Sequence, residues 1–146
     1  MKTSTVAAIV AAALSGPASA DQGRATFAVT VTVPARAAVD TLEQPAVLEV
    51  TAADVALGYK DVTARYRVRH NDRNGYLLQI STSDGPVQWI VVRGLDVDVM
   101  LHDTVEIPRP GAPFEQDLAL DFRFVLDPST PPGTFPLPLR VAAQPI

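Results

Sequence analysis

The hydrophobic pattern of this chain is mainly the two-residue alternation of β-strands. The alternation begins at Ala25 and ends at Pro34, and its apolar face carries Phe27, Val29, Val31 and Val33. Small and polar residues, including Thr30 and Thr32, occupy the opposite face. Because successive side chains of a strand point to opposite sides, this segment is predicted to be a half-buried strand.

Further alternating runs predict seven more strands. They are Val47 to Val50, Val62 to Val68, Tyr76 to Ile80, Val87 to Val92, Leu95 to Leu101, Leu118 to Leu126 and Phe135 to Ala143. Asn74-Gly75 predicts a hairpin between the third and fourth strands of the chain, and Arg93-Gly94 predicts one between the fifth and sixth. Thr51 to Leu57 is expected to form one short turn of helix.

Short strands with one apolar face each bury that face when two sheets stack. We therefore predict an all-β fold, an immunoglobulin-like antiparallel β-sandwich of seven or eight strands. In the last predicted strand the buried side carries Phe135, Leu137, Leu139, Val141 and Ala143. Pro136 and Pro138 lie between them and lack an N–H donor, which predicts a sheet edge and protects that edge against aggregation.

The first twenty residues have the order of a secretory signal peptide. A positive start at Met1 and Lys2 precedes the apolar run Val6 to Leu14, and Ala18-Ser19-Ala20 forms a cleavage site. That run is too short to span a bilayer, which needs about 20 helical residues. The expected organisation is a signal peptide at 1–20 and a single domain at 21–146, exported to the periplasm, the cell surface or the medium, with no membrane span.

Composition removes several classes of function. The chain has no cysteine, which excludes disulfides, thiolate metal sites and a thiol nucleophile. Acidic residues outnumber basic ones, 16 to 12. That balance argues against a nucleic-acid partner, because such proteins neutralise phosphates with basic side chains. Ser81, Thr82 and Ser83 lack the surroundings of a hydrolase nucleophile.

Two polar clusters resemble metal sites only in part. The turn from His70 to Gly75 is similar to the start of a calcium loop, but His70 and Ser81 stand where acidic ligands are needed. Asp96 and Asp98 share one strand face near His102 and Asp103, yet an outward, solvated face explains them equally well. We predict no catalytic residue, metal site or cofactor, and no enzymatic activity.

Two further features suggest ligand binding, and each has a structural alternative. Arg65, Arg67 and Arg69 line one strand face at about 7 Å spacing. They are expected to form a ladder with acidic residues of a neighbouring strand, with Asp96 and Asp98 as candidates, or else an anionic ligand patch. Trp89, the only tryptophan, is in phase with Val87 and Val91, which predicts core packing, with ligand stacking as the alternative.

Both ends of the chain carry motifs of a known family. The segment ATFAVTVTVPARAAVD, from Ala25 to Asp40, resembles the start of a mature fimbrial subunit of the chaperone-usher type, with Ala37 where that family has its first cysteine. Pro132-Gly133-Thr134-Phe135 is similar to the opening of a pilin's last strand. The stretch Asn71 to Ile80 resembles secreted domains of the spore coat protein U type.

The resemblance implies a structural or adhesive subunit that assembles by strand pairing. In that family an incomplete sandwich accepts the N-terminal strand of a neighbouring subunit. Here Phe27, Val29, Val31 and Val33 would be the donor face, or they would be the protein's own first strand. The acceptor would be flanked by the strand from Phe135 to Ala143. The implied partners are a periplasmic chaperone, an usher and other subunits. The alternative is a monomeric binding module that uses the arginines or Trp89 to contact an anionic glycan or a protein.

Overall fold

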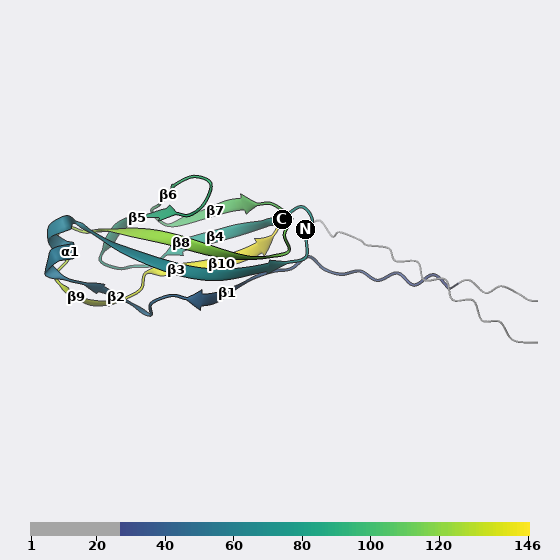
Figure 1. Cartoon of the computed structure of the whole chain (residues 1–146), viewed down its shortest axis with the longest axis horizontal. Helices are drawn as coiled ribbons and strands as arrows, with labels where there is room; N and C mark the ends of the chain where they lie inside the picture. Colours follow the sequence, from purple (N-terminus) through teal and green to yellow (C-terminus); the bar gives the residue numbers. More distant parts are fainter. Residues whose placement is uncertain (1–26) are drawn as a thin grey trace, which may run out of the picture. The chain divides into compact units, whose positions relative to one another are not determined.

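The computed structural model describes residues 27–146, so the predicted signal peptide at 1–20 lies outside the described residues. Its contacts divide the chain into Met1–Ala35 and Arg36–Ile146. The second unit holds every described helix and strand (Figure 1). The predicted all-β class is confirmed.

Arg36–Ile146 contains ten strands and one short helix, all labelled in Figure 1. The strands are β1 (Ala37–Glu43), β2 (Val47–Val50), β3 (Tyr59–His70), β4 (Tyr76–Thr82), β5 (Val87–Arg93), β6 (Val99–Leu101), β7 (Thr104–Arg109), β8 (Glu115–Leu126), β9 (Gly133–Pro136) and β10 (Leu139–Pro145). The helix is α1 (Ala52–Leu57).

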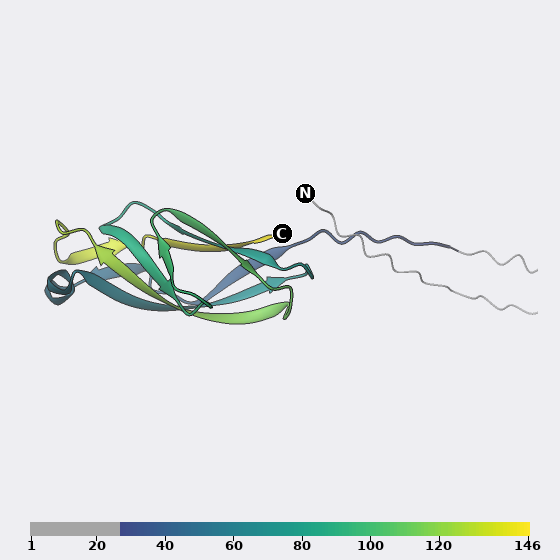
Figure 2. The same ribbon diagram turned by 90° about the horizontal axis from the view of Figure 1, so that it is seen from above.

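The strands form three antiparallel sheets. A five-stranded sheet has the order β1-β3-β8-β5-β6, a three-stranded sheet has the order β10-β4-β7, and β2 pairs with β9. Strands distant in sequence therefore become neighbours: β3 pairs with β8 from Tyr59↔Val125 to Arg69↔Glu115. Figure 2 shows the strands running along the length of this unit.

The core lies between the two larger sheets and is built from alternate residues of their strands. Tyr66, Phe122 and Phe124 of the five-stranded sheet and Leu78 and Ile80 of the three-stranded sheet are at most 1% exposed. Since each strand has one apolar face, stacking two sheets removes both faces from water.

Most of the alternating runs are strands as predicted. Val47–Val50 is β2, and the runs at 62–68, 76–80, 87–92 and 118–126 lie within β3, β4, β5 and β8. The predicted helical turn is α1, which begins with a capping box in which the Thr51 hydroxyl accepts from the Asp54 N–H and the Asp54 carboxylate accepts from the Thr51 N–H. The hairpin of β5 and β6 is also present, although the sixth strand is shorter than predicted.

The hairpin predicted across Asn74-Gly75 is wrong. β3 pairs with β1 and β8, whereas β4 pairs with β10 and β7, so the turn carries the chain from one sheet to the other. The turn is packed into the end of the sandwich, because Asp72 and Gly75 are buried and a Cβ at Gly75 would meet the carbonyl group of Arg109. A turn signal marks the reversal and leaves open which sheet receives the next strand.

Three other predictions differ from the structure. The last strand is two strands, because the chain leaves β2 after Pro136 and joins β4 from Leu139. β1 and β7 were not predicted. The described part of the first predicted strand, residues 27–33, has no assigned strand.

Candidate assembly edge and exposed sheet face

Residues 27–35 expose the apolar alternation that the sequence predicted to be half-buried. They form neither helix nor strand. Phe27 is 76% exposed, Val29 57%, Val31 52% and Val33 50%. Four large apolar side chains at every second residue are thus presented to solvent, in the arrangement that a strand needs to cover one apolar surface.

One side of the sandwich presents two free strand edges. β1 is the last strand of the five-stranded sheet and β10 the last strand of the three-stranded sheet, and the two lie in contact. Among the described strands, β1 pairs only with β3 and β10 pairs only with β4. We call these two facing edges the seam. Its apolar side chains, Ala37, Val39, Val141 and Ala143, pack on the core but are only partly buried.

The two prolines do not obstruct the seam. Pro136 lies in β9, opposite Val47, and Pro138 lies between β9 and β10. From Leu139 to Gln144 every residue of β10 has an N–H group. Of the predicted edge residues, Leu139 and Val141 belong to β10, Phe135 belongs to β9, and Leu137 connects the two strands.

The opposite side of the sandwich is closed by the chain itself. There β6 and β7 are the last strands of the two sheets, and only His102 and Asp103 separate them in sequence. The Thr82 N–H donates to the Asp103 carbonyl at 2.8 Å, which ties this connection to β4. The seam is therefore the side on which both sheets end in strands that each have one pairing partner among the described strands.

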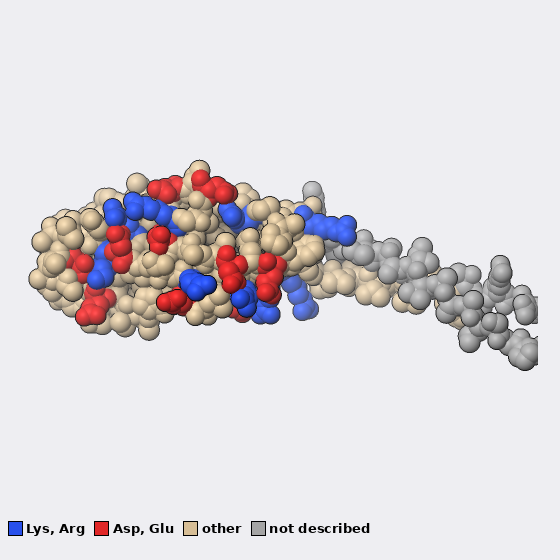
Figure 3. Space-filling view, viewed as in Figure 1, with Lys and Arg blue, Asp and Glu red and all other residues tan. Residues whose placement is uncertain are grey.

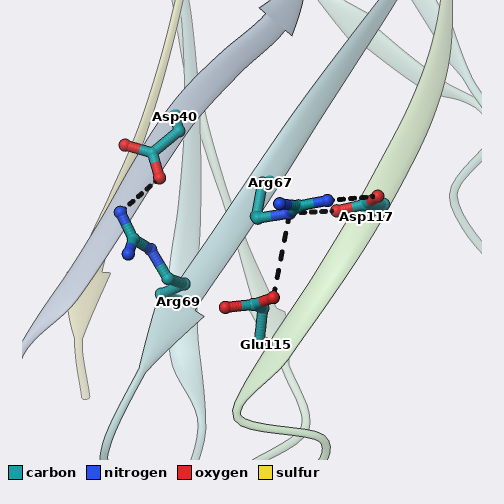
Figure 4. Close-up of polar contacts among 5 residues, drawn as sticks. All are labelled: Asp40, Arg67, Arg69, Glu115 and Asp117. Carbon is teal, nitrogen blue, oxygen red and sulfur yellow. Dashed lines mark hydrogen bonds and ion pairs between the residues drawn. The ribbon is translucent and has the colours of Figure 1, made fainter.

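The arginine row on β3 is largely neutralised by its neighbours. Arg67 donates to both carboxylate oxygens of Asp117 on β8, at 2.7 and 3.1 Å, and Arg69 donates to Asp40 on β1 at 2.5 Å (Figure 4). The hydrogen bond from Arg67 lowers the pKa of Asp117 below its usual range. A cross-strand ladder was predicted, but its partners are not Asp96 and Asp98.

Asp96 and Asp98 have other partners, in the loop after β5. Asp96 accepts from Arg109 at 3.0 Å, and Asp98 lies 3.5 Å from Arg93. Within residues 27–146 no group of three or more His, Asp or Glu side chains is arranged to hold a metal ion. In the calcium-like turn one Asp72 carboxylate oxygen accepts from the Asn74 N–H at 2.9 Å, and the other is buried without a hydrogen-bond partner among the described residues.

Trp89 lies on the outer face of the five-stranded sheet, so its predicted place in the core is wrong. The core-facing residues of β5 are Ile90 and Val92, both fully buried, while Trp89 is half-buried. Trp89 pairs with Val125, whereas Arg65 pairs with Ala119, six residues along the same strand. The structure therefore separates Trp89 from the arginine row by about 20 Å along the sheet.

The surroundings of Trp89 are the functional candidate that the sequence did not reveal. Its ring centroid lies 6.0 Å from that of His102, and Tyr59 lies across β8, opposite Val125. The Arg123 guanidinium sits 4.0 Å from the centroid of the Tyr59 ring and donates twice to Asp61, which lowers the pKa of Asp61. The sequence signals were that 87–92 is apolar on both faces apart from Gln88, and that ligand stacking was the alternative to core packing for Trp89.

The comparisons with known proteins add no relative. The chain matches no protein-family model, and searches of curated proteins and of solved structures return no match. No helix in residues 27–146 is long and apolar enough to cross a membrane.

Proposed function

We propose that this chain is an exported, non-enzymatic structural or adhesive subunit that assembles like a pilin, by β-strand pairing at a sheet edge. Segment 27–33 of one copy would be the donor, and the seam of another copy would be the acceptor. A periplasmic chaperone, an usher and other subunits would be its partners. The observation that carries this proposal is the exposed apolar alternation of 27–33 in a chain whose sandwich has two adjacent free edges.

The chemistry of the two parts is complementary. A strand placed in the seam gains main-chain hydrogen bonds from its neighbours and covers partly buried side chains with its own. Segment 27–33 has seven residues, the same number as β10, so both span about 23 Å when extended. Covering the seam with Phe27, Val29, Val31 and Val33 would bury apolar surface on both partners at about 25 cal/mol per Å².

The position of β1 favours the donor role over the alternative role as first strand. Ala37–Glu43 already pairs with β3 from Ala37↔His70 to Glu43↔Arg65. The edge of the five-stranded sheet is therefore occupied by β1, and segment 27–33 is left over for another partner. The anionic-ligand alternative is weakened, because Arg67 and Arg69 already have carboxylate partners.

The test compares two substitutions in segment 27–33. Both introduce aspartate, one on the apolar face and the other on the opposite face. The chain from Asp21 to Ile146 is examined by size-exclusion chromatography with light scattering. Val31→Asp places a charge on the apolar face and should abolish ordered oligomers without changing the unfolding transition. Thr32→Asp places the same charge on the opposite face and should leave assembly unchanged.

A peptide completes the test. The peptide Ala25 to Val33 should raise the melting temperature of the Val31→Asp protein, and the same peptide with Asp at 29 and 31 should not. A wild-type chain that stays monomeric, melts cooperatively and is destabilised by Val31→Asp would contradict the proposal, since segment 27–33 would then complete its own sandwich. Absence of any peptide effect would also contradict it.

A further inference from the structure

The outer face of the five-stranded sheet carries a row of mainly aromatic, partly exposed side chains. Tyr59 of β3, Val125 of β8 and Trp89 of β5 occupy one cross-strand line, and His102 follows β6 beside Trp89. We call these four residues the aromatic row. Tyr59, Val125 and Trp89 are half-buried and His102 is exposed, and none of the four belongs to the core.

The row is flat and about 10 Å long between its two largest rings, because Tyr59 and Trp89 stand two strands apart. Arg123 stacks on Tyr59 and is itself held by Asp61, and the His102 ring lies beside Trp89. Side chains that already have neighbours of this kind lose less conformational entropy when a ligand binds.

A hollow with both polar and apolar walls adjoins the row. Its volume is about 260 Å³, and Asp61, Thr63, Arg93, Asp121 and Arg123 line it. Most of these groups are held in pairs, since Arg123 donates to Asp61 and the Thr63 hydroxyl donates to Asp121 at 2.7 Å. Carboxylates, a hydroxyl and guanidinium groups offer both acceptors and donors next to the aromatic surface.

This region is net negative, with two guanidinium groups against three carboxylates, which distinguishes it from a site for anions. Arg93 and Arg123 face Asp61, Asp98 and Asp121, so no positive charge is in excess. Figure 3 likewise shows acidic and basic side chains side by side over the face that it draws. An anionic ligand would need unpaired guanidinium groups.

The narrowness of the row also argues against a protein partner. A stable protein interface buries about 800 Å² on each side and has a core that is poor in charged residues. Here the very next cross-strand row already contains the ion pair of Asp61 and Arg123. A ligand that is apolar on one face and carries hydroxyl groups along its edge fits both rows at once.

The geometry points to a binding site for a neutral oligosaccharide on this face. The C–H faces of sugar rings would stack on Trp89 and His102, and the hydroxyl groups would bond to Asp61, Thr63 and Arg123, whose guanidinium covers the Tyr59 ring. This site is independent of the proposed assembly, because it lies on the outer face of the five-stranded sheet and makes no use of segment 27–33.

The emission of the single tryptophan makes the test direct. Cellohexaose, maltohexaose and laminarihexaose are titrated into the Asp21 to Ile146 protein while Trp89 fluorescence is recorded, and calorimetry repeats each titration that shifts the emission. We expect at least one of the three to bind. His102→Ala, an exposed position, should weaken its binding about tenfold. Trp89→Ala should abolish the binding in calorimetry. Arg65→Ala, at the other end of the same face, should leave it unchanged.

Four results would overturn the site. The first is that none of the three sugars shifts the emission at about 1 mM. The second is that the His102→Ala and wild-type proteins bind sugar equally well. Tighter binding of an oligogalacturonate, lost in Arg65→Ala, would move the site to the arginine row. If the Trp89 emission changes with protein concentration when no sugar is present, this face of the five-stranded sheet is a contact between copies of the chain.

Discussion

Two segments of this chain have the same alternation of apolar and polar residues and differ in what covers them. In β8, Leu120, Phe122 and Phe124 are at most 1% exposed, because β3 and β5 flank the strand and the second sheet lies over it. In segment 27–33 the equivalent side chains are at least half exposed. Alternation therefore specifies that a segment has an apolar face, and the tertiary structure decides whether this chain covers that face itself.

The largest expected difference is between the two phenylalanines of this comparison. Phe122→Ala should lower the free energy of unfolding by about 3 to 5 kcal/mol, because it removes a fully buried ring and leaves a cavity. Phe27→Ala should change it by about 0.5 kcal/mol or less, as an exposed side chain does. Urea unfolding of the two variants measures both values. A cost for Phe27→Ala near that of Phe122→Ala would show that the chain buries segment 27–33 itself.

The same contrast explains how much of the fold the sequence could predict. β3 and β8 were predictable because they are long and apolar on one face only. β1 was not, since its half-covered side chains include only Ala37 and Val39 as apolar contacts with the core. β7 has two such contacts, Val105 and Ile107, in a six-residue strand that also contains Pro108.

The phase of β5 and the fate of the Asn74-Gly75 turn needed three-dimensional information. The run 87–92 is apolar on both faces, so either Trp89 or Ile90 could have faced the core. Its pairing with β8 places Ile90 opposite Phe124 and beside Leu101, which puts Ile90 inside and Trp89 outside. The aromatic row combines residues from four separate segments, and no spacing along the chain reveals it.

The next largest effect on stability is expected at Tyr66. It tests how completely water is excluded from the core face of β3. Burial raises the pKa of its phenol to about 12, and its hydroxyl donates to the Gln44 amide oxygen at 2.6 Å. The ordinary phenol pKa is about 10, so the unfolded chain loses this proton first. The resulting contribution to stability is present in full below pH 10 and is lost as the pH rises through 12, a loss of about 3 kcal/mol.

Urea unfolding between pH 8 and pH 11.5 measures this slope. Tyr66→Phe removes the titrating group and should flatten the part of the decline that is due to Tyr66, although it also loses the bond to Gln44, worth about 1 kcal/mol at every pH. An unchanged slope in Tyr66→Phe would mean that water reaches this phenol, and that the face of β3 is less completely covered than that of β8.

A loss smaller than those of Phe122 and Tyr66 concerns Thr51, whose interactions are local and need no partner strand. Thr51→Ala should lower the free energy of unfolding by about 1 kcal/mol, because the hydroxyl caps α1 by accepting from the Asp54 N–H. Thr51→Ser keeps the hydroxyl and should cost much less. Hydrogen bonds from the Thr51 backbone and hydroxyl, with a further bond from Lys60, lower the pKa of Asp54, so the contribution of this carboxylate is present above its ordinary pKa and is lost as the pH falls through its lowered value.

The difference between Thr51→Ala and wild type should therefore shrink in acid, once Asp54 is protonated, and stay constant from pH 5 to pH 8. If the stability difference between Thr51→Ala and wild type is the same at pH 2.5 and pH 7, the capping contribution of Thr51 does not depend on the Asp54 carboxylate. This local element completes the comparison. The polar groups of Thr51 and Asp54 bond to each other within the segment 51–54. The apolar face of β8 is covered by strands of the same chain. Segment 27–33 has the same alternation as β8, but the sandwich formed by residues 36–146 already has β1 as its first strand.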